Sequence, residues 1–110
     1  MSGRVSTRRD VLAAAAAAML LPAAASAEGR IHIVVMAKMR FGPAPPDLRA
    51  GDAIEWVNDD IFRHTATASD GSFDLDLAAG ARGRTAFGKA GAVMVRCRFH
   101  PGMTLRLVVG

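Results

Sequence analysis

The sequence predicts an all-β fold, a small Greek-key β-sandwich that follows a cleaved N-terminal signal. Beyond residue 28, glycine, proline and Asp-Gly turn signals recur about every 8–12 residues, which is typical of the short strands of a sandwich or barrel. No stretch keeps a helical period of apolar residues, and we find no internal repeat. The single cysteine excludes an internal disulfide, and a core this small gives only about 3–5 kcal/mol. A metal is therefore the remaining candidate to supplement it.

Residues 1–27 are predicted to be an export signal that is removed before the protein functions. Arg8 and Arg9 precede an alanine-rich apolar run over 11–21, which is shorter than the roughly 18 residues expected of a membrane span. The segment 25–27 (Ala-Ser-Ala) has the small-x-small pattern of a signal-peptidase site. The arginine pair also resembles the twin-arginine pattern of bacterial export, which predicts a periplasmic protein without stable membrane insertion.

The domain itself, residues 28–110, is predicted to consist of short strands and turns. Alternating or β-branched segments predict strands at 30–36, 53–58, 64–69, 92–97 and 104–109, and turns are predicted at 50–52, 70–71, 79–80 and 90–91. Three prolines within 41–46 exclude a helix there, and helix is limited to one turn around 75–79. His32 is expected to face away from Ile31 and Ile33, on the exposed side of its strand, and not to be a ligand.

The stretch CRFHPGM predicts a metal site on the tight loop between the last two strands. It holds Cys97, His100 and Met103 at equal spacing, with a Pro-Gly turn inside the loop. One position remains for a fourth ligand, and His64, at the head of an earlier strand, is the natural partner. Each of these residues taken alone is more simply a packing or surface residue. Their joint spacing favours ligation.

The predicted set His64, Cys97, His100 and Met103 has the chemistry of a type 1 copper site. Two imidazoles and a thiolate with a weak axial thioether are the donors of blue-copper electron-transfer centres. The soft sulfur donors suit Cu(I), whereas imidazole tolerates Cu(II), so one copper ion is the expected cofactor. Four side-chain donors would close the coordination sphere, which argues against an enzyme because catalytic metal sites keep an open position.

The same stretches resemble type 1 copper proteins of the cupredoxin superfamily, most of all amicyanin, plastocyanin and pseudoazurin. The resemblance covers nearly all of 28–110 and includes RHTATA, GSFDLDLAAG and CRFHPGM. It implies that the copper ligands fall on His64, Cys97, His100 and Met103. It also implies that His100 reaches the surface through an apolar patch and serves as the electron port. Thr65 stands where many relatives have asparagine, a position where hydrogen bonding to the thiolate adjusts the reduction potential.

These observations predict a monomeric periplasmic carrier that shuttles single electrons between redox partners, such as a c-type cytochrome or a periplasmic dehydrogenase. The alternative is a copper-binding protein that buffers or delivers the metal in the periplasm. Nucleic acid is not an expected partner, because the net charge of +4 comes partly from the signal and forms no dense basic stripe. Four arginines close in sequence to the ligands could form a basic rim that steers an acidic partner, or simply a solvated face: Arg63, Arg96, Arg98 and Arg106.

Overall fold

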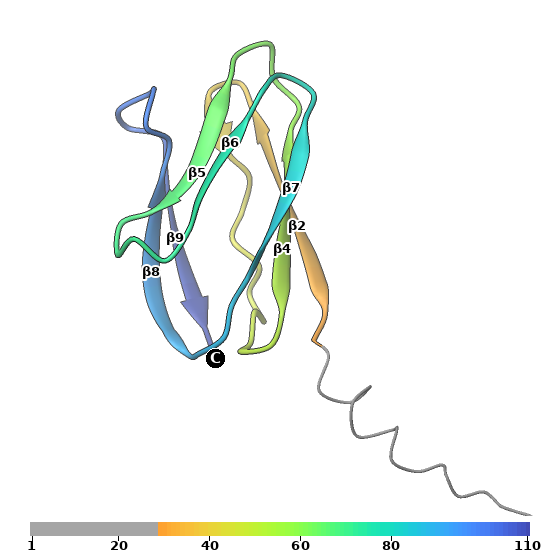
Figure 1. The fold of residues 1–110 in the computed structure, drawn as a ribbon, viewed down its shortest axis with the longest axis vertical. Helices are drawn as coiled ribbons and strands as arrows, with labels where there is room; N and C mark the ends of the chain where they lie inside the picture. Colours follow the sequence, from red (N-terminus) through yellow and green to blue (C-terminus); the bar gives the residue numbers. More distant parts are fainter. Residues whose placement is uncertain (1–28) are drawn as a thin grey trace, which may run out of the picture.

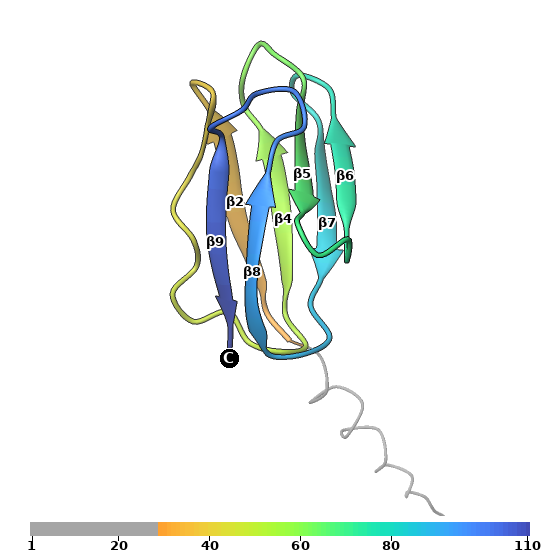
Figure 2. The ribbon, with the colours of Figure 1, turned by 90° about the vertical axis from the view of Figure 1, so that its left-hand side faces the viewer.

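The computed structural model describes residues 29–110, which form two four-stranded sheets packed face to face (Figures 1 and 2). One sheet has the strand order β3-β2-β4-β7 and the other β6-β5-β8-β9. The strands are β2 (Ile31–Ala37), β3 (Arg40–Phe41), β4 (Ala53–Asn58), β5 (His64–Ala68), β6 (Asp74–Leu77), β7 (Arg82–Ala86), β8 (Gly91–Arg96) and β9 (Thr104–Val109). The predicted β-sandwich is confirmed. The predicted export signal, residues 1–27, lies outside the described residues and stays a prediction.

The order of the strands along the chain moves repeatedly from one sheet to the other. β2 and β4 pair in parallel, so the segment after β3 must return the chain to the end where β2 began. The other pairs, from β2–β3 to β8–β9, are antiparallel. After β4 the chain crosses to β5 in the opposite sheet, and after β7 it crosses to β8. These crossings bring segments that are distant in sequence to the same end of the molecule.

The core lies between the sheets and is built from alternate residues of each strand. In β4, Ile54, Trp56 and Asn58 are buried while their neighbours are partly exposed. Trp56 is fully buried, and its indole N–H donates a hydrogen bond of 2.9 Å to the hydroxyl of Thr85. A buried indole with a satisfied N–H adds packing area without leaving an unpaired donor. The sandwich therefore has a stiff centre on which loops can be mounted.

Two segments differ from what the sequence suggested. The segment around 75–79 is not a helical turn, because Asp74–Leu77 pairs with β5 as an antiparallel strand that points Leu77 into the core and Asp76 to solvent. His32 does face away from Ile31 and Ile33, but the two isoleucines are the exposed residues. The side chain of His32 is only 12% exposed, and it bonds to the buried carboxylate of Asp52.

The connection from β4 to β5 and the loop from β8 to β9 lie at the same end of the sandwich, opposite the C-terminus (Figure 2). The β2–β3 hairpin lies at this end too. Both segments that carry predicted ligands are therefore neighbours in space. Residues 29–110 include no helix long and apolar enough to span a membrane.

Candidate metal centre

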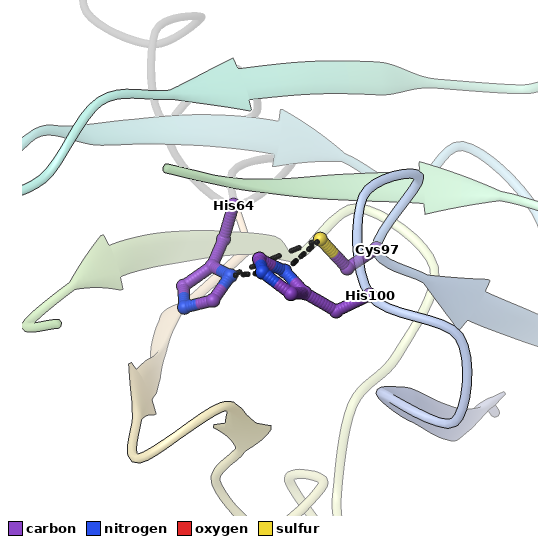
Figure 3. Close-up of side chains that lie close together, drawn as sticks. All are labelled: His64, Cys97 and His100. Atoms are coloured by element: carbon purple, nitrogen blue, oxygen red, sulfur yellow. Dashed lines mark hydrogen bonds between the residues drawn. The ribbon is translucent and has the colours of Figure 1, made fainter. Parts of the chain in front are cut away.

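Three of the four predicted ligands converge at the end of the sandwich where these loops meet. Figure 3 shows the side chains of His64, Cys97 and His100 pointing toward one another. The two Nδ1 atoms are 3.2 Å apart, and the Cys97 sulfur lies 3.8 Å from Nδ1 of His64 and 3.4 Å from Nδ1 of His100. Donor atoms that bind one transition-metal ion at roughly 2.0–2.3 Å lie about 3–4 Å from each other. These three residues are placed to bind a metal ion.

The loop between β8 and β9 holds two of these donors in a closed turn. The backbone N–H of Cys97 donates to the carbonyl of Met103 at 3.1 Å, and the N–H of Met103 donates to the carbonyl of His100 at 3.1 Å. Gly102 has a φ of 92°, a left-handed conformation that residues with a side chain rarely adopt. The equal spacing in CRFHPGM thus corresponds to a loop closed on itself by its own backbone.

Met103 lies at the C-terminal end of this loop. It is buried, with 3% of its surface exposed, and it belongs to the hydrophobic core cluster. Its backbone bonds tie it to both Cys97 and His100. Its role as the fourth, axial ligand stays a prediction.

His64 is fully buried at the first position of β5, and its ring is oriented by Asp60. Nε2 of His64 lies 2.8 Å from Oδ2 of Asp60. The bond from His64, together with amide bonds from Met39 and Ile61, lowers the pKa of Asp60 to about 2, so this carboxylate can only accept. Nε2 must therefore carry the proton, which leaves the lone pair of Nδ1, on the side of Cys97 and His100, available to a metal ion.

Asn58 fixes the loop that carries Asp60. This residue ends β4 and is fully buried. Its amide nitrogen donates to the carbonyls of Phe62 at 2.8 Å and Leu77 at 3.0 Å, while its oxygen accepts the N–H of Asp60 at 3.1 Å. The side chain of Asn58 thus holds the β4–β5 connection against the second sheet. In this way it positions the start of β5, where His64 lies.

The environment of Cys97 favours its thiolate. Burial of Cys97 by itself raises the pKa of the thiol, but hydrogen bonds, chiefly from the Thr65 amide and the His100 ring, outweigh it and lower the pKa to about 6. The N–H of Thr65 donates to the sulfur at 3.4 Å. At neutral pH the site therefore presents one anionic sulfur and two imidazole nitrogens, a donor set that fits copper.

No protein-family model and no curated protein matches the chain. The chain is, however, similar to several solved structures. Amicyanin from Paracoccus versutus is 23% identical with a TM-score of 0.62, and the match covers 73% of this chain and 81% of that protein. A purple cupredoxin from Nitrosopumilus maritimus is 20% identical with a TM-score of 0.64, covering 72% and 99%. The reduced state of an amicyanin mutant is 25% identical with a TM-score of 0.64, covering 73% and 82%. The chain has the cupredoxin fold.

In this cupredoxin fold, three of the sequence-predicted ligand residues, His64, Cys97 and His100, are placed to bind a metal ion. One of the similar amicyanin structures is a Cu(I) form. Sequence reasoning missed Asp60 and Asn58, which hold His64 and its loop. The spacing of an acid four residues before a histidine was visible, but nothing in the sequence showed that the intervening loop would fold back so that the two side chains meet.

The surface around His100 combines exposed apolar side chains with neutralised charge. His100 is partly buried, and its ring lies 6.1 Å from that of Phe62, centroid to centroid. Phe62 is 48% exposed and Phe99 45%. Two of the four arginines considered for a basic rim are ion-paired, because Arg63 bonds to Asp76 at 3.0 Å and Arg98 bonds to Asp74 at 3.1 Å. The neighbourhood of His100 thus combines exposed aromatic rings with paired charges.

Proposed function

We propose that this chain is a periplasmic electron carrier that holds one type 1 copper ion through His64, Cys97, His100 and Met103. The observation that carries the proposal is the convergence of one sulfur and two Nδ1 atoms, all within 4.8 Å of one another. Copper supplies a one-electron couple between Cu(II) and Cu(I) that can be held by this mixture of soft and intermediate donors. The chain has no substrate of its own in this role.

The residues around the donors keep them in place before any metal arrives. His64 is held by Asp60, and the backbone bonds of its own loop position Cys97. Because the donors need not reorganise, little nuclear displacement accompanies a change of charge at the site, which is the condition for fast electron transfer. A stiff sandwich end supports a carrier in this way.

Burial favours retention of the metal over its delivery. His64 has no exposed surface and Cys97 only 4%. A delivery protein must let an acceptor reach its donors, whereas here only His100 comes near the surface. That ring can pass an electron to a partner, a c-type cytochrome or a periplasmic dehydrogenase, that docks on the exposed rings of Phe62 and Phe99. Small, brief contacts are typical of such encounters.

The test is to add Cu(II) to the purified chain 28–110 and to record its visible spectrum. We expect an intense thiolate-to-copper charge-transfer band that disappears in Cys97→Ala. The copper should remain bound through repeated cycles of chemical reduction and oxidation in the presence of a Cu(I) chelator. A colourless protein would overturn copper binding, and release of the ion on first reduction would overturn the carrier role.

A further inference from the structure

A closed ring of hydrogen bonds lies on the outer face of the β6-β5-β8-β9 sheet, directly against the segment that carries Cys97. The backbone N–H of Arg98 donates to the hydroxyl of Thr65 at 2.9 Å, and this hydroxyl lies 2.8 Å from that of Thr67. The hydroxyl of Thr67 donates to Asp74 at 2.7 Å. The guanidinium Nε of Arg98 donates to the same carboxylate oxygen at 3.1 Å and closes the ring.

The direction of every bond in this ring is fixed by chemistry. Bonds from Thr67 and Arg98 lower the pKa of Asp74, which is therefore a carboxylate at neutral pH and can only accept. The single proton of the Thr67 hydroxyl is committed to Asp74, so Thr67 must accept from Thr65. Thr65 then donates to Thr67 and accepts from the N–H of Arg98. No hydroxyl in the ring is free to rotate.

The ring joins a buried part and an exposed part. Thr65 is fully buried and Thr67 is 8% exposed, although both side chains lie on the outer face of β5. The side chains of Asp74 and Arg98 are 53% and 36% exposed. Exposed ion pairs contribute little to stability, commonly below about 1 kcal/mol. Stability alone therefore does not account for the pairing of Arg98 with Asp74.

The ring holds two residues that lie next to Cys97. Thr65 donates its backbone N–H to Sγ of Cys97. Arg98 follows Cys97 in the chain, and its own N–H is bound within the ring. We propose that Asp74 and Arg98 are positioning residues for the Cys97 sulfur, acting through Thr67 and Thr65 to hold the amide that hydrogen-bonds to it.

This inference rests on the proposed copper site and concerns how the surrounding residues tune its reduction potential. An N–H that donates to the thiolate withdraws negative charge from it, which favours Cu(I) over Cu(II), and hydrogen bonding around the cysteine sulfur tunes the potential of such sites. If the ring is opened, the Thr65 amide should hold the sulfur less firmly. The reduction potential should then fall, and the charge-transfer band should shift.

The test opens the ring at two places and compares it with a matched substitution elsewhere. Thr67→Val removes one buried hydroxyl while keeping the branched shape, and Asp74→Ala removes the exposed acceptor on an edge strand. The control is Thr85→Val, which removes a hydroxyl of similar burial, 9% exposed, that serves Trp56 in the other sheet. Two measurements are made: amide hydrogen exchange in the metal-free chain, and reduction potential with visible spectrum in the copper-loaded chain.

Both ring variants should accelerate exchange at the Thr65 and Arg98 amides by on the order of tenfold relative to amides of the β2–β4 pair, about the effect of losing one buried hydrogen bond. Thr67→Val, which leaves the net charge unchanged, should lower the potential. Asp74→Ala also removes a negative charge, which acts on the potential in the opposite direction, so its readout is the shift of the visible band. Thr85→Val should change neither quantity. Unchanged relative exchange would overturn the inference. Faster exchange with an unaltered potential and spectrum would also overturn it, because the ring would then be merely structural. A wild-type chain that binds no copper would instead overturn the proposed function itself.

Discussion

Two histidine–aspartate pairs bracket strand β4, and they are nearly identical in geometry. Asp52 stands just before the strand begins, and Asp60 follows shortly after it ends. In each pair, Nε2 of the histidine lies 2.8 Å from Oδ2 of the acid, His32 with Asp52 and His64 with Asp60. In each aspartate, Oδ2 also accepts one backbone N–H, and Oδ1 accepts another. These backbone donors are Arg49 and Arg30 for Asp52, and Met39 and Ile61 for Asp60.

The pairs differ in what the second ring nitrogen meets. Nδ1 of His64 faces the Cys97 sulfur and the ring of His100. Nδ1 of His32 lies 3.9 Å from a carboxylate oxygen of Asp47, which in turn pairs with Arg30. The comparison shows that the aspartate orients an imidazole at both ends of β4. Whether that imidazole serves a metal or an ion-pair cluster is decided by the residues opposite Nδ1.

The largest difference is expected when each histidine is removed. His64→Ala should lower copper affinity by more than the roughly 10–100-fold that outer hydrogen-bond partners contribute, because a direct donor is lost. His32→Ala should leave copper affinity and the visible band unchanged. Copper titration followed by absorbance measures both.

His32→Ala also serves as the folding control for this pair of variants. It should lower the urea midpoint of the metal-free chain, because the carboxylate of Asp52 loses a hydrogen-bond partner while the metal donors are untouched. Equal loss of copper affinity in the two variants would contradict the distinction between the two ends.

A smaller effect is expected from the acids, compared as Asp60→Asn and Asp52→Asn. In Asp60 one oxygen serves both His64 and the Met39 amide, so an asparagine must turn its NH2 group toward a donor or leave one unpaired. We expect copper affinity to fall about 10–100-fold. The potential should rise, because loss of a negative charge near the metal favours Cu(I).

Asp52→Asn meets the same geometric conflict at the other end of β4, so it is the matched control. It should destabilise the chain without changing copper affinity or potential, as read by equilibrium titration and voltammetry. If Asp60→Asn left both copper readouts at their wild-type values, Asp60 would have no part in orienting the ligand.

The sequence predicted the parts of this arrangement that are local in the chain. The strand at Ala53–Asn58, the Asp70-Gly71 hairpin and the loop CRFHPGM each depend on residues a few positions apart, and the structure contains all three. The convergence of His64 with Cys97 and His100 was also predictable, but only because the joint spacing of the three matched a known chemistry.

Contacts between distant segments were not predictable in the same way. His32 and Asp52 are 20 positions apart, and they meet because β2 and β4 pair in parallel, which no local pattern indicates. Strand β6 was missed because its residues, Asp and Leu, are weak strand formers that gain their conformation from pairing with β5. The partners of Arg63 and Arg98 lie on that strand, so these two ion pairs were not predictable either.

The smallest expected effect is on acid stability, and it reports on the Asp52 end alone. The hydrogen bond from His32, with those from the amides of Arg30 and Arg49, lowers the pKa of Asp52 to about 2. An unfolded aspartate titrates near about 3.9, so between these values the unfolded chain binds more protons than the folded one. The contribution of this carboxylate is therefore complete above about pH 4 and is lost as the pH falls through about 2.

In the metal-free chain, Asp52→Asn should remove part of this pH dependence. Urea midpoints measured from about pH 5 down to about pH 2 should fall less steeply in the variant than in the wild type, and the two curves should approach each other at the acid end. Parallel curves over that range would mean that the pair does not favour the ionised acid. The geometric likeness between the two ends of β4 would then not extend to their electrostatics, and Asp60 would need its own explanation as the group that orients His64.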